Sequence, residues 1–321
     1  MDLSVIIPTR NRSQLLRRTL EALERQSLPR SSFEVICVDD GSAPEHRRAL
    51  QDLHPRLAFQ LARRPHGGLA AARNTGARRA SGEILLFLDD DVAPVPGSLR
   101  AHLEGHAGGA LRVVIGAVVF SPRLRRTAFQ AYLERSGYYD LYADPNKYPQ
   151  GRPPLPPMQG NASVPRALFE RAGGYDESFC TYGGEDLELG HRLAKLGAEF
   201  FYEPRARGLH LHAKDFARFC DDMEQLGAAI VRIWRKHPEI RAAKKIDVLQ
   251  DPIWRLPPGR WHLKLVLSIT EACPWLLAGP RAILAAGDSH HVFRGLLFPL
   301  FRWVAYYHYA QGMRRGLEAI P

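Results

Sequence analysis

An apolar run that ends in three consecutive carboxylates limits the folds open to this chain: Ile84-Leu85-Leu86-Phe87-Leu88-Asp89-Asp90-Asp91-Val92. The five apolar residues follow Ser81-Gly82 and are typical of a strand buried on both faces, as in a parallel sheet between helices. In open sheets of this kind, ligands bind in the crevice at the carboxyl ends of the strands. Asp89 and Asp91 are suited to hold a divalent cation whose remaining positions are filled by substrate phosphates. The alternative is a solvated acidic turn that caps the next helix.

The segments before this run predict alternating strands and helices. Strands are expected at residues 3–7, 33–38 and 57–61. Helical periodicity separates them, and a small-residue helix opens after Gly67-Gly68, so the order βαβαβαβ predicts a mostly parallel sheet with right-handed crossovers. Polar loops follow three strands at one sheet edge: Thr9-Arg10, Asp39-Asp40 and Asp89-Asp90-Asp91. Each loop alone is explained by turns and helix caps, but three at one edge favour a nucleotide site.

The composition, and the absence of several known binding motifs, limit the classes of ligand that the protein is expected to bind. The formal net charge of +10 indicates an anionic partner. The basic residues are dispersed and no nucleic-acid-binding motif occurs, so nucleic acid is not expected. Neither the P-loop nor the dinucleotide-binding glycine signature is present, which leaves a metal ion and arginine to hold a diphosphate. Four scattered cysteines without C-x-x-C spacing and an amino end without a signal peptide favour a reducing compartment.

Seven motifs, in their order along the chain, resemble those of the family 2 glycosyltransferases, which have the GT-A fold and use nucleotide-diphosphate sugars. On the donor side these are VIIPTRNR (5–12), VDDGS (38–42), ARNTG (72–76) and LFLDDD (86–91). On the acceptor side these are GNASVPR (160–166), GGYDE (173–177) and GGEDLELGHRL (183–193). The resemblance covers about two-thirds of the chain and implies a GT-A-like, mostly parallel sheet flanked by helices.

The resemblance implies a role for each matching donor-side residue. The nucleotide sugar would be bound by Pro8, Thr9, Arg10, Asp39, Asp40, Arg73, Asp89 and Asp90. Within this set Asp39 would bind the base or ribose, Asp40 would support its loop, and Arg73 would approach the base and phosphates. Asp91, with Asp89 on the ribose or metal side, would coordinate magnesium or manganese bridging the diphosphate, which stabilises the leaving group.

On the acceptor side the resemblance implies a pocket that includes Gly160, Asn161 and Gly184. Asp186 lies at the start of an expected helix, where the helix dipole favours the ionised carboxylate that a general base requires. The resemblance makes Asp186 this base and lets Glu185 position the acceptor or the loop. An ordinary acidic residue in the first helical turn is the alternative.

Two histidines near the end of the expected domain are further candidate metal ligands. His210 and His212 alternate along an extended segment, so their imidazoles are expected on one side of the chain. Imidazole suits manganese better than magnesium. The family resemblance also implies a histidine in this region, and we favour His210 of the two. A surface strand with two exposed histidines is the alternative.

The remaining segments predict a loop and a helical extension. The tyrosine- and proline-rich segment 138–157 is expected to be a long loop, either a lid that stacks on a sugar or a surface-packed loop. Residues 216–233 predict an amphipathic helix that ends before His237-Pro238. Beyond Trp254, no apolar run reaches the ~18 residues of a spanning helix. Aromatic residues interleaved with arginine suit an anionic membrane surface, or equally burial against the protein or in a homodimer.

These observations predict a glycosyltransferase domain over residues 1–214 and a helical extension over 215–321, for which membrane association is one of the two roles above. The domain comprises a nucleotide-sugar half (1–120) and an acceptor half (121–214). The expected activity is inverting transfer of a sugar from a nucleotide-diphosphate donor, most simply UDP-linked, to a hydroxyl of a carbohydrate or lipid-linked acceptor. A metal-dependent nucleotidyltransferase and a non-catalytic nucleotide-sugar-binding module are the alternatives. The expected location is the cytoplasm, with peripheral attachment to the inner face of the plasma membrane.

Overall fold

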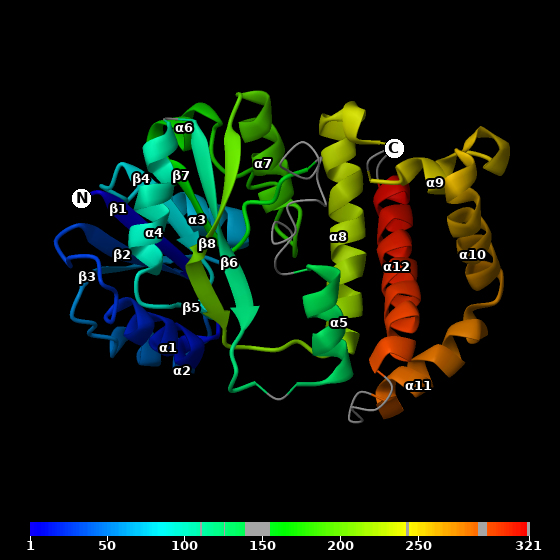
Figure 1. The fold of residues 1–321 in the computed structure, drawn as a ribbon, viewed down its shortest axis with the longest axis horizontal. Helices are drawn as coiled ribbons and strands as arrows, with labels where there is room; N and C mark the ends of the chain where they lie inside the picture. Colours follow the sequence, from blue (N-terminus) through cyan, green and yellow to red (C-terminus); the bar gives the residue numbers. More distant parts are fainter. Residues whose placement is uncertain (110, 125, 139–154, 242–243, 288–293, 320–321) are drawn as a thin grey trace. The chain divides into compact units, whose positions relative to one another are not determined.

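The structure is a computed structural model that describes residues 1–109, 111–124, 126–138, 155–241, 244–287 and 294–319 (Figure 1). The chain forms two compact units. The sheet unit comprises residues 1–124, 137–181 and 185–213, and the helical unit comprises residues 125–136, 182–184 and 214–321. Most of the tyrosine- and proline-rich loop lies outside the described residues, so its role as a lid stays a prediction.

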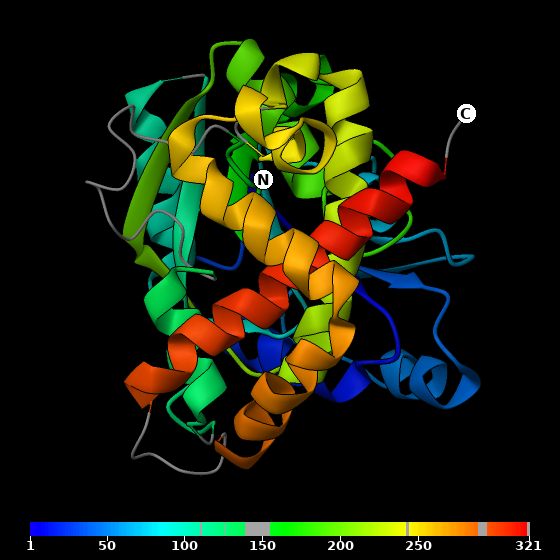
Figure 2. The same ribbon diagram turned by 90° about the vertical axis from the view of Figure 1, so that its right-hand side faces the viewer.

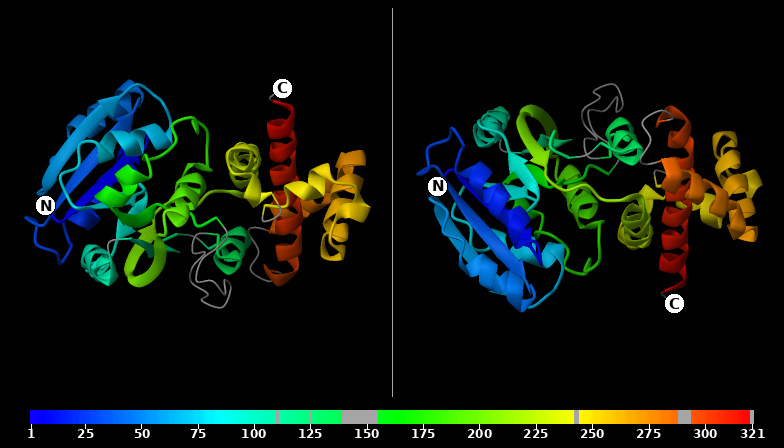
Figure 3. Two further views of the ribbon diagram at one scale, coloured as in Figure 1. Left: turned by 90° about the horizontal axis from the view of Figure 1, so that it is seen from above. Right: turned by 90° about the horizontal axis from the view of Figure 1, so that it is seen from below.

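The sheet unit is built on eight strands in the order β3-β2-β1-β4-β7-β6-β8-β5 (Figures 1 and 3). The strands are β1 (Leu3–Thr9), β2 (Phe33–Asp40), β3 (Ala58–Arg64), β4 (Ile84–Leu88), β5 (Val92–Pro94), β6 (Arg112–Phe120), β7 (Asn161–Pro165) and β8 (Glu199–His210). β1 pairs in parallel with β2 and β4, β2 with β3, and β6 with β8. β7 pairs antiparallel with β4 and β6, and β5 with β8. The mostly parallel sheet predicted from the sequence is confirmed.

Helices cover both faces of this sheet. They are α1 (Ser13–Leu23), α2 (Pro44–Gln51), α3 (Leu69–Ala77), α4 (Ser98–Gly105), the 3₁₀ helix η1 (His106–Gly108), α6 (Arg166–Arg171) and α7 (Glu185–Lys195). Because side chains alternate along a strand, Phe87 of β4 packs with Leu189 of α7 in one apolar core. Its neighbour Leu86 packs with Leu16 of α1 in the other core. β4 is therefore buried on both faces, as its apolar run predicted.

The small residues of α3 let this helix lie close to β1. Ala70, Ala71 and Ala72 are buried, and a Cβ atom added at Gly76 would lie 2.4 Å from Cγ2 of Ile6. A contact that short forces the neighbouring side chain to move, so a larger residue at position 76 would push α3 outward. This close packing positions Arg73, three residues before Gly76 in the same helix, at the edge where β1, β2 and β4 end.

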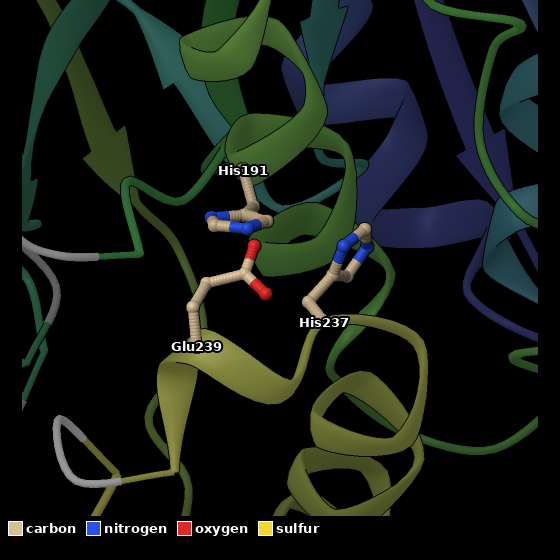
Figure 4. Close-up of side chains that lie close together, drawn as sticks. All are labelled: His191, His237 and Glu239. Carbon is tan, nitrogen blue, oxygen red and sulfur yellow. The ribbon is translucent and has the colours of Figure 1, made fainter.

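The helical unit consists of α5 (Ala128–Ser136), α8 (Phe216–Lys236), η2 (Pro238–Ile240), α9 (Ile246–Gln250), η3 (Ile253–Arg255), η4 (Pro258–Arg260), α10 (Trp261–Ala272), η5 (Pro274–Leu277), α11 (Ala278–Gly287) and α12 (Arg294–Glu318). α8 begins after Asp215, whose carboxylate accepts a 2.7 Å hydrogen bond from the Arg218 amide. It ends at Lys236, and His237 and Glu239 follow in the turn and in η2 (Figure 4). The predicted end of this helix before His237-Pro238 is confirmed.

Within the helical unit, α12 lies between α8 and α10 (Figure 1). α8 and α12 approach closely at two glycines: an added Cβ would lie 2.1 Å from the Tyr309 carbonyl oxygen at Gly227, and 1.8 Å from the Glu224 carbonyl oxygen at Gly312. Helix α5 belongs to this unit through an aromatic cluster, whereas the sequence prediction places residues 128–136 in the acceptor half. The Phe129 ring of α5 lies 5.2 Å from that of Phe219. In the part of the chain that the structure describes, no helix is long and apolar enough to cross a membrane.

Candidate active site

The three carboxylates after β4 face different partners. Asp90 is buried and accepts hydrogen bonds from the Thr9 hydroxyl (2.7 Å) and from Nη1 of Arg12 (2.8 Å). Nη2 of the same arginine donates to Oδ2 of Asp91 at 2.6 Å. Thr9 and Asp90 bond to each other, and their binding of the nucleotide sugar stays a prediction. Arg12 received no role from the sequence, although it lies in the VIIPTRNR motif that carried the resemblance.

Burial and neighbouring charges act in opposite directions on Asp90 and Asp91. Burial raises the pKa of Asp90 to about 7, although Arg12 opposes this shift. For Asp91, burial also raises the pKa, but electrostatic interactions with His210 and Arg12 outweigh burial, so the net pKa is lowered. Asp91 is therefore the carboxylate of this pair that stays ionised near neutral pH, which is the state that a metal ligand requires.

His210 and His212 do not share an environment. His210, the last residue of β8, is buried, and its Nε2 lies 3.7 Å from Oδ2 of Asp91. Its Nδ1 donates a hydrogen bond to the backbone carbonyl of His212, which leaves the lone pair of neutral imidazole on Nε2. His212 lies beyond the strand and its side chain is exposed. The two histidines therefore differ in exposure, and β8 ends between them, so the predicted placement of both imidazoles on one side stays a prediction.

The end of β2 is organised by Asp40. Its carboxylate accepts hydrogen bonds from the amides of Gly67 (3.0 Å) and Gly68 (2.9 Å) and pairs with Arg64 and with Nδ1 of His66 (2.7 Å). These bonds outweigh burial and lower its pKa. Asp40 thus orders the loop that leads into α3, which is the supporting role that the resemblance implied.

The two other polar positions at this edge differ in exposure. Asp39 is buried, and its Oδ1 accepts a 2.9 Å hydrogen bond from the amide of Ser42. Arg10 is exposed and its Nη1 lies 3.1 Å from Nε2 of His66. Pro8, which precedes them in β1, is buried. The carboxyl ends of β1, β2 and β4 therefore meet at one edge, as their parallel pairing requires.

Arg73 is buried between two carboxylates from distant parts of the sequence. Nη1 donates to Oε1 of Glu185 and Nη2 to Oδ1 of Asp89, each at 3.0 Å. The guanidinium also lies over the ring of Tyr175, 5.2 Å from its centroid. The resemblance implied that Arg73 approaches the nucleotide, and the structure adds that it joins the acidic end of β4 to the first turn of α7.

The first turn of α7 holds Glu185 and Asp186. Burial raises the pKa of Glu185, with a further increase from Asp186 beside it. Its Oε2 atom is buried and has no hydrogen-bond partner among the described residues. Burial also raises the pKa of Asp186, although Arg73 opposes it. From the sequence we expect the helix start to favour the ionised carboxylate, but burial has the larger effect on the pKa of Asp186. His191 lies further along α7 (Figure 4).

The predicted acceptor-side residues have structural explanations for their identities. A Cβ added at Gly160 would lie 1.9 Å from Oδ2 of Asp89, so only glycine leaves that carboxylate in place. Gly184 has a φ of 97°, a conformation that favours glycine. Asn161 is fully buried: its amide donates to the carbonyls of Ala117 (3.2 Å) and Ala206 (2.7 Å), and its Oδ1 pairs with His102. Its side chain is therefore committed to contacts inside the sheet unit.

Residues 4–170 match glycosyl transferase family 2, and residues 157–214 match the N-terminal domain of galactosyltransferase. Validoxylamine A glucosyltransferase of Streptomyces hygroscopicus subsp. jinggangensis is 33% identical over 262 residues, 74% of this chain and 61% of the relative. Pre-mycofactocin glycosyltransferase of Mycobacterium tuberculosis is 29% identical over 252 residues, 74% of this chain and 48% of the relative. This chain therefore spans only about half to three-fifths of the length of these relatives.

Solved structures show the same fold. The mannosyltransferase PcManGT from Pyrobaculum calidifontis, in complex with GDP-Man and Mn²⁺, has a TM-score of 0.64 at 21% identity and covers 99% of this chain and 88% of that chain. GalNAc-T7 with UDP, GalNAc and Mn²⁺ has a TM-score of 0.57 at 18% identity, covering 90% and 58%. Because the family match spans more than half of the sequence and these solved structures share its fold, the chain belongs to glycosyl transferase family 2 and has the GT-A fold.

Proposed function

We propose that this protein is an inverting glycosyltransferase that moves a sugar from a nucleotide-diphosphate donor to a hydroxyl of a carbohydrate or lipid-linked acceptor. The position of Arg73 carries this proposal. Its guanidinium joins Asp89, in the donor-side motif, to Glu185, in the acceptor-side motif, through two 3.0 Å hydrogen bonds. One hydrogen-bonded network thus spans both motifs, which supports direct transfer between a donor and an acceptor bound side by side.

The chemistry assigned to the start of α7 is a single displacement. Asp186 accepts the proton of the acceptor hydroxyl while that oxygen attacks the anomeric carbon of the sugar. The new carbon–oxygen bond forms as the bond from this carbon to the diphosphate oxygen breaks, and the diphosphate leaves with the electron pair. The raised pKa of Asp186 makes its carboxylate a stronger proton acceptor. Glu185, whose Oε2 has no partner among the described residues, would position the hydroxyl.

A divalent cation, manganese or magnesium, fits the residues after β4. Asp91 stays ionised, and Nε2 is the ring nitrogen with which His210 would bind the cation, because Nδ1 is used in a bond to a carbonyl. Asp89, two residues before Asp91 in the sequence, would supply a further carboxylate. When bound, the cation neutralises the charge that develops on the leaving diphosphate. A donor set that combines oxygen with imidazole nitrogen suits manganese. The exposed side chain of His212 is not part of this proposed set.

Substitutions of the proposed general base, Asp186, and of its neighbour Glu185 distinguish a catalytic role from a structural role of these residues. General-base catalysis contributes ~100- to 10,000-fold, so Asp186→Asn should lower kcat by this order while the donor affinity, measured by calorimetry, changes little. Glu185→Gln should mainly raise KM for the acceptor. Asp221→Asn, the same change at an exposed site in α8, is the matched control and should leave both unchanged. Loss of donor affinity in Asp186→Asn would make that residue structural, and unchanged turnover would remove it from the mechanism.

The metal assignment has its own test. Asp91→Asn should remove the manganese dependence of nucleotide-sugar binding, because the lost carboxylate charge is the main attraction for the cation. Calorimetric titration with Mn²⁺ in the presence of the nucleoside diphosphate measures this directly. Asp221→Asn again serves as the control for loss of one negative charge. A wild-type titration curve from Asp91→Asn would show that the cation binds elsewhere.

The donor is most simply UDP-linked, and a thermal-shift screen tests this choice. The similar solved structures hold GDP-Man in one case and UDP in the other. A bound donor raises Tm by mass action, so UDP- and GDP-sugars should be compared with and without Mn²⁺. Released pyrophosphate instead of nucleoside diphosphate would indicate a nucleotidyltransferase. Donor binding without turnover over a broad acceptor panel would indicate a non-catalytic module.

We further propose that the enzyme works in the cytoplasm, at the inner face of the plasma membrane. All four cysteines are free thiols, and Cys37 and Cys220 are buried, as is usual in a reducing compartment. Cell fractionation with antibody detection tests the location, and recovery only from an extracellular or periplasmic fraction would contradict it. The alternative use of the helical unit, as a homodimer interface, is addressed by the experiments below.

A further inference from the structure

Helix α10 presents its more apolar side to solvent. On its inner side it buries Leu267 and Thr270, and the Thr270 hydroxyl accepts a 3.2 Å hydrogen bond from the indole nitrogen of Trp303 in α12. On its outer side Trp261, Leu265 and Ile269 are exposed. These three follow one another every four residues and therefore form one stripe along the helix. A helix that packs only against its own protein has the opposite arrangement, with its apolar stripe inward.

Neighbouring segments of the helical unit carry further exposed apolar side chains. We call the set the outer apolar face: Trp254 of η3, Trp261, Leu265 and Ile269 of α10, Trp275 of η5 and Ile283 of α11. Their exposed fractions lie between 44% and 78%. α10 and α11 lie on the same side of α12 (Figure 2). Side chains of this size expose on the order of 600 Å² in total, which is as large as the functional patches of soluble proteins.

The charged residues of the segment that carries the outer apolar face are mostly positive. From residue 252 to residue 284 the only acidic residue is Glu271, which is half-buried and paired with Arg314. Arg255 and Arg281 of the same segment are exposed. Tryptophan prefers the boundary between water and hydrocarbon, and arginine is attracted to anionic headgroups. The combination of exposed tryptophan, aliphatic residues and arginine without exposed acid therefore matches the surface of an anionic bilayer.

A second copy of the chain fits this face less well. In a two-fold symmetric dimer the same patch meets itself, so Arg255 and Arg281 would approach arginines of the other copy. The acidic residues of the segment and just before it, Glu271 and Asp251, are already paired with Arg314 and Arg241. The desolvation of unpaired charges is unfavourable in a protein interface, whereas phosphate groups of a lipid surface would pair with both arginines.

We propose that the outer apolar face of the helical unit binds the surface of an anionic lipid bilayer, with α10 parallel to the membrane plane. Trp254, Trp261 and Trp275 insert at the headgroup boundary, and Leu265 and Ile269 enter the outer part of the hydrocarbon. The face does not include any residue assigned to the reaction above. Membrane binding and sugar transfer are therefore separable, and failure of one does not imply failure of the other.

Vesicle sedimentation of the full chain tests the apolar contact. Wild-type protein should pellet with phosphatidylcholine vesicles that contain phosphatidylglycerol, and less at high salt because charge attraction is screened. Leu265→Ser with Ile269→Ser should weaken the partition coefficient by about tenfold for each residue removed from hydrocarbon. Leu111→Ser is the matched control, because Leu111 is an exposed leucine of the sheet unit. All three residues are exposed, so circular dichroism should show unchanged folding.

Tryptophan fluorescence tests which residues insert. All five tryptophans lie between residues 234 and 303. Addition of anionic vesicles should shift wild-type emission to the blue, and Trp254→Phe with Trp275→Phe should remove most of that shift. Trp234→Phe, in α8 and outside the outer apolar face, should leave the shift intact. Arg255→Gln should weaken binding to anionic vesicles but have no effect with phosphatidylcholine alone.

Three results would overturn the proposal. The first is equal pelleting of the Leu265→Ser/Ile269→Ser variant and wild type. The second is equal binding of wild type to neutral and anionic vesicles, which would remove the role of the arginines. The third is a wild-type dimer in light scattering without vesicles that becomes monomeric in the same double variant, because the face would then belong to a second copy. Sugar transfer to a water-soluble acceptor should be unchanged in the double variant in every case.

Discussion

Acidification should destabilise the sheet unit through His102, which lies inside a buried polar network. Its Nε2 donates to Oδ1 of Asn161 (3.0 Å), and its Nδ1 pairs with the hydroxyl of Ser163 (2.9 Å). The hydroxyl is also 2.8 Å from Nε2 of His106. These bonds connect α4 and η1 to β7, the antiparallel strand between β4 and β6. A neutral imidazole satisfies this network, whereas a protonated one would bring a charge into it.

The size of the effect follows from the pKa of His102. Burial lowers this pKa from 6.5 to about 4. Between these values the unfolded chain binds a proton that the folded chain does not, so stability rises with pH and falls on acidification. At 1.36 kcal/mol per pH unit the full difference is about 3.4 kcal/mol, reached below the folded pKa. Of this, about 2 kcal/mol is lost between pH 7 and pH 5.

The assay must report on the sheet unit alone. All five tryptophans lie between residues 234 and 303, in the helical unit, so their fluorescence does not follow the unfolding of the sheet. Cys37, a buried free thiol of β2, becomes accessible when the sheet unit unfolds and therefore reports on this unit. Urea titrations at pH 7, 6 and 5, read by pulse labelling of Cys37 and mass spectrometry, give the unfolding free energy of this unit. Wild type should lose at least about 2 kcal/mol from pH 7 to pH 5.

The variant His102→Gln distinguishes the contribution of His102 to the pH dependence of stability from that of the other titratable groups. It should be less stable at pH 7, but its loss between pH 7 and pH 5 should be smaller than that of wild type by about 2 kcal/mol. His106, whose pKa is also lowered to about 4, still titrates in the variant and accounts for part of the remaining loss. His54→Gln, at an exposed site, is the control. Equal losses in wild type and His102→Gln would refute the assignment.

Three further substitutions test other contacts. Arg12→Gln removes the positive charge that pairs with the acidic loop after β4. The free energy of unfolding should fall by about 3 kcal/mol. In thermal-shift assays, Mn²⁺ should raise the Tm of this variant more than that of wild type. Gly160→Ala places a Cβ 1.9 Å from Oδ2 of Asp89 and should reduce kcat/KM by tenfold or more in steady-state kinetics. Gly312→Ala places a Cβ 1.8 Å from the Glu224 carbonyl oxygen and should destabilise the helical unit by about 1–3 kcal/mol in urea unfolding followed by tryptophan fluorescence.

Local patterns in the sequence were sufficient for the architecture of the sheet unit. The apolar run 84–88 forms β4, buried on both faces, and the loops after β1, β2 and β4 meet at one edge. The prediction of these features was correct because strand burial and parallel pairing depend on short-range apolar patterns and on the order of the elements. The helix at 216–236 was predictable for the same reason, since its apolar period and its proline boundary are local features.

Only the tertiary structure decided which of the polar residues bond to one another. Arg73 and Glu185 are separated by 112 positions, and no local pattern joins them. Asn161, predicted beside the acceptor, is buried among backbone carbonyls, and the direction of the Asp186 pKa shift follows from burial rather than from the helix dipole. α5 joins the helical unit because Phe129 packs against Phe219. Such outcomes depend on which surfaces exclude water together, and that is a property of the packed chain and not of any single segment.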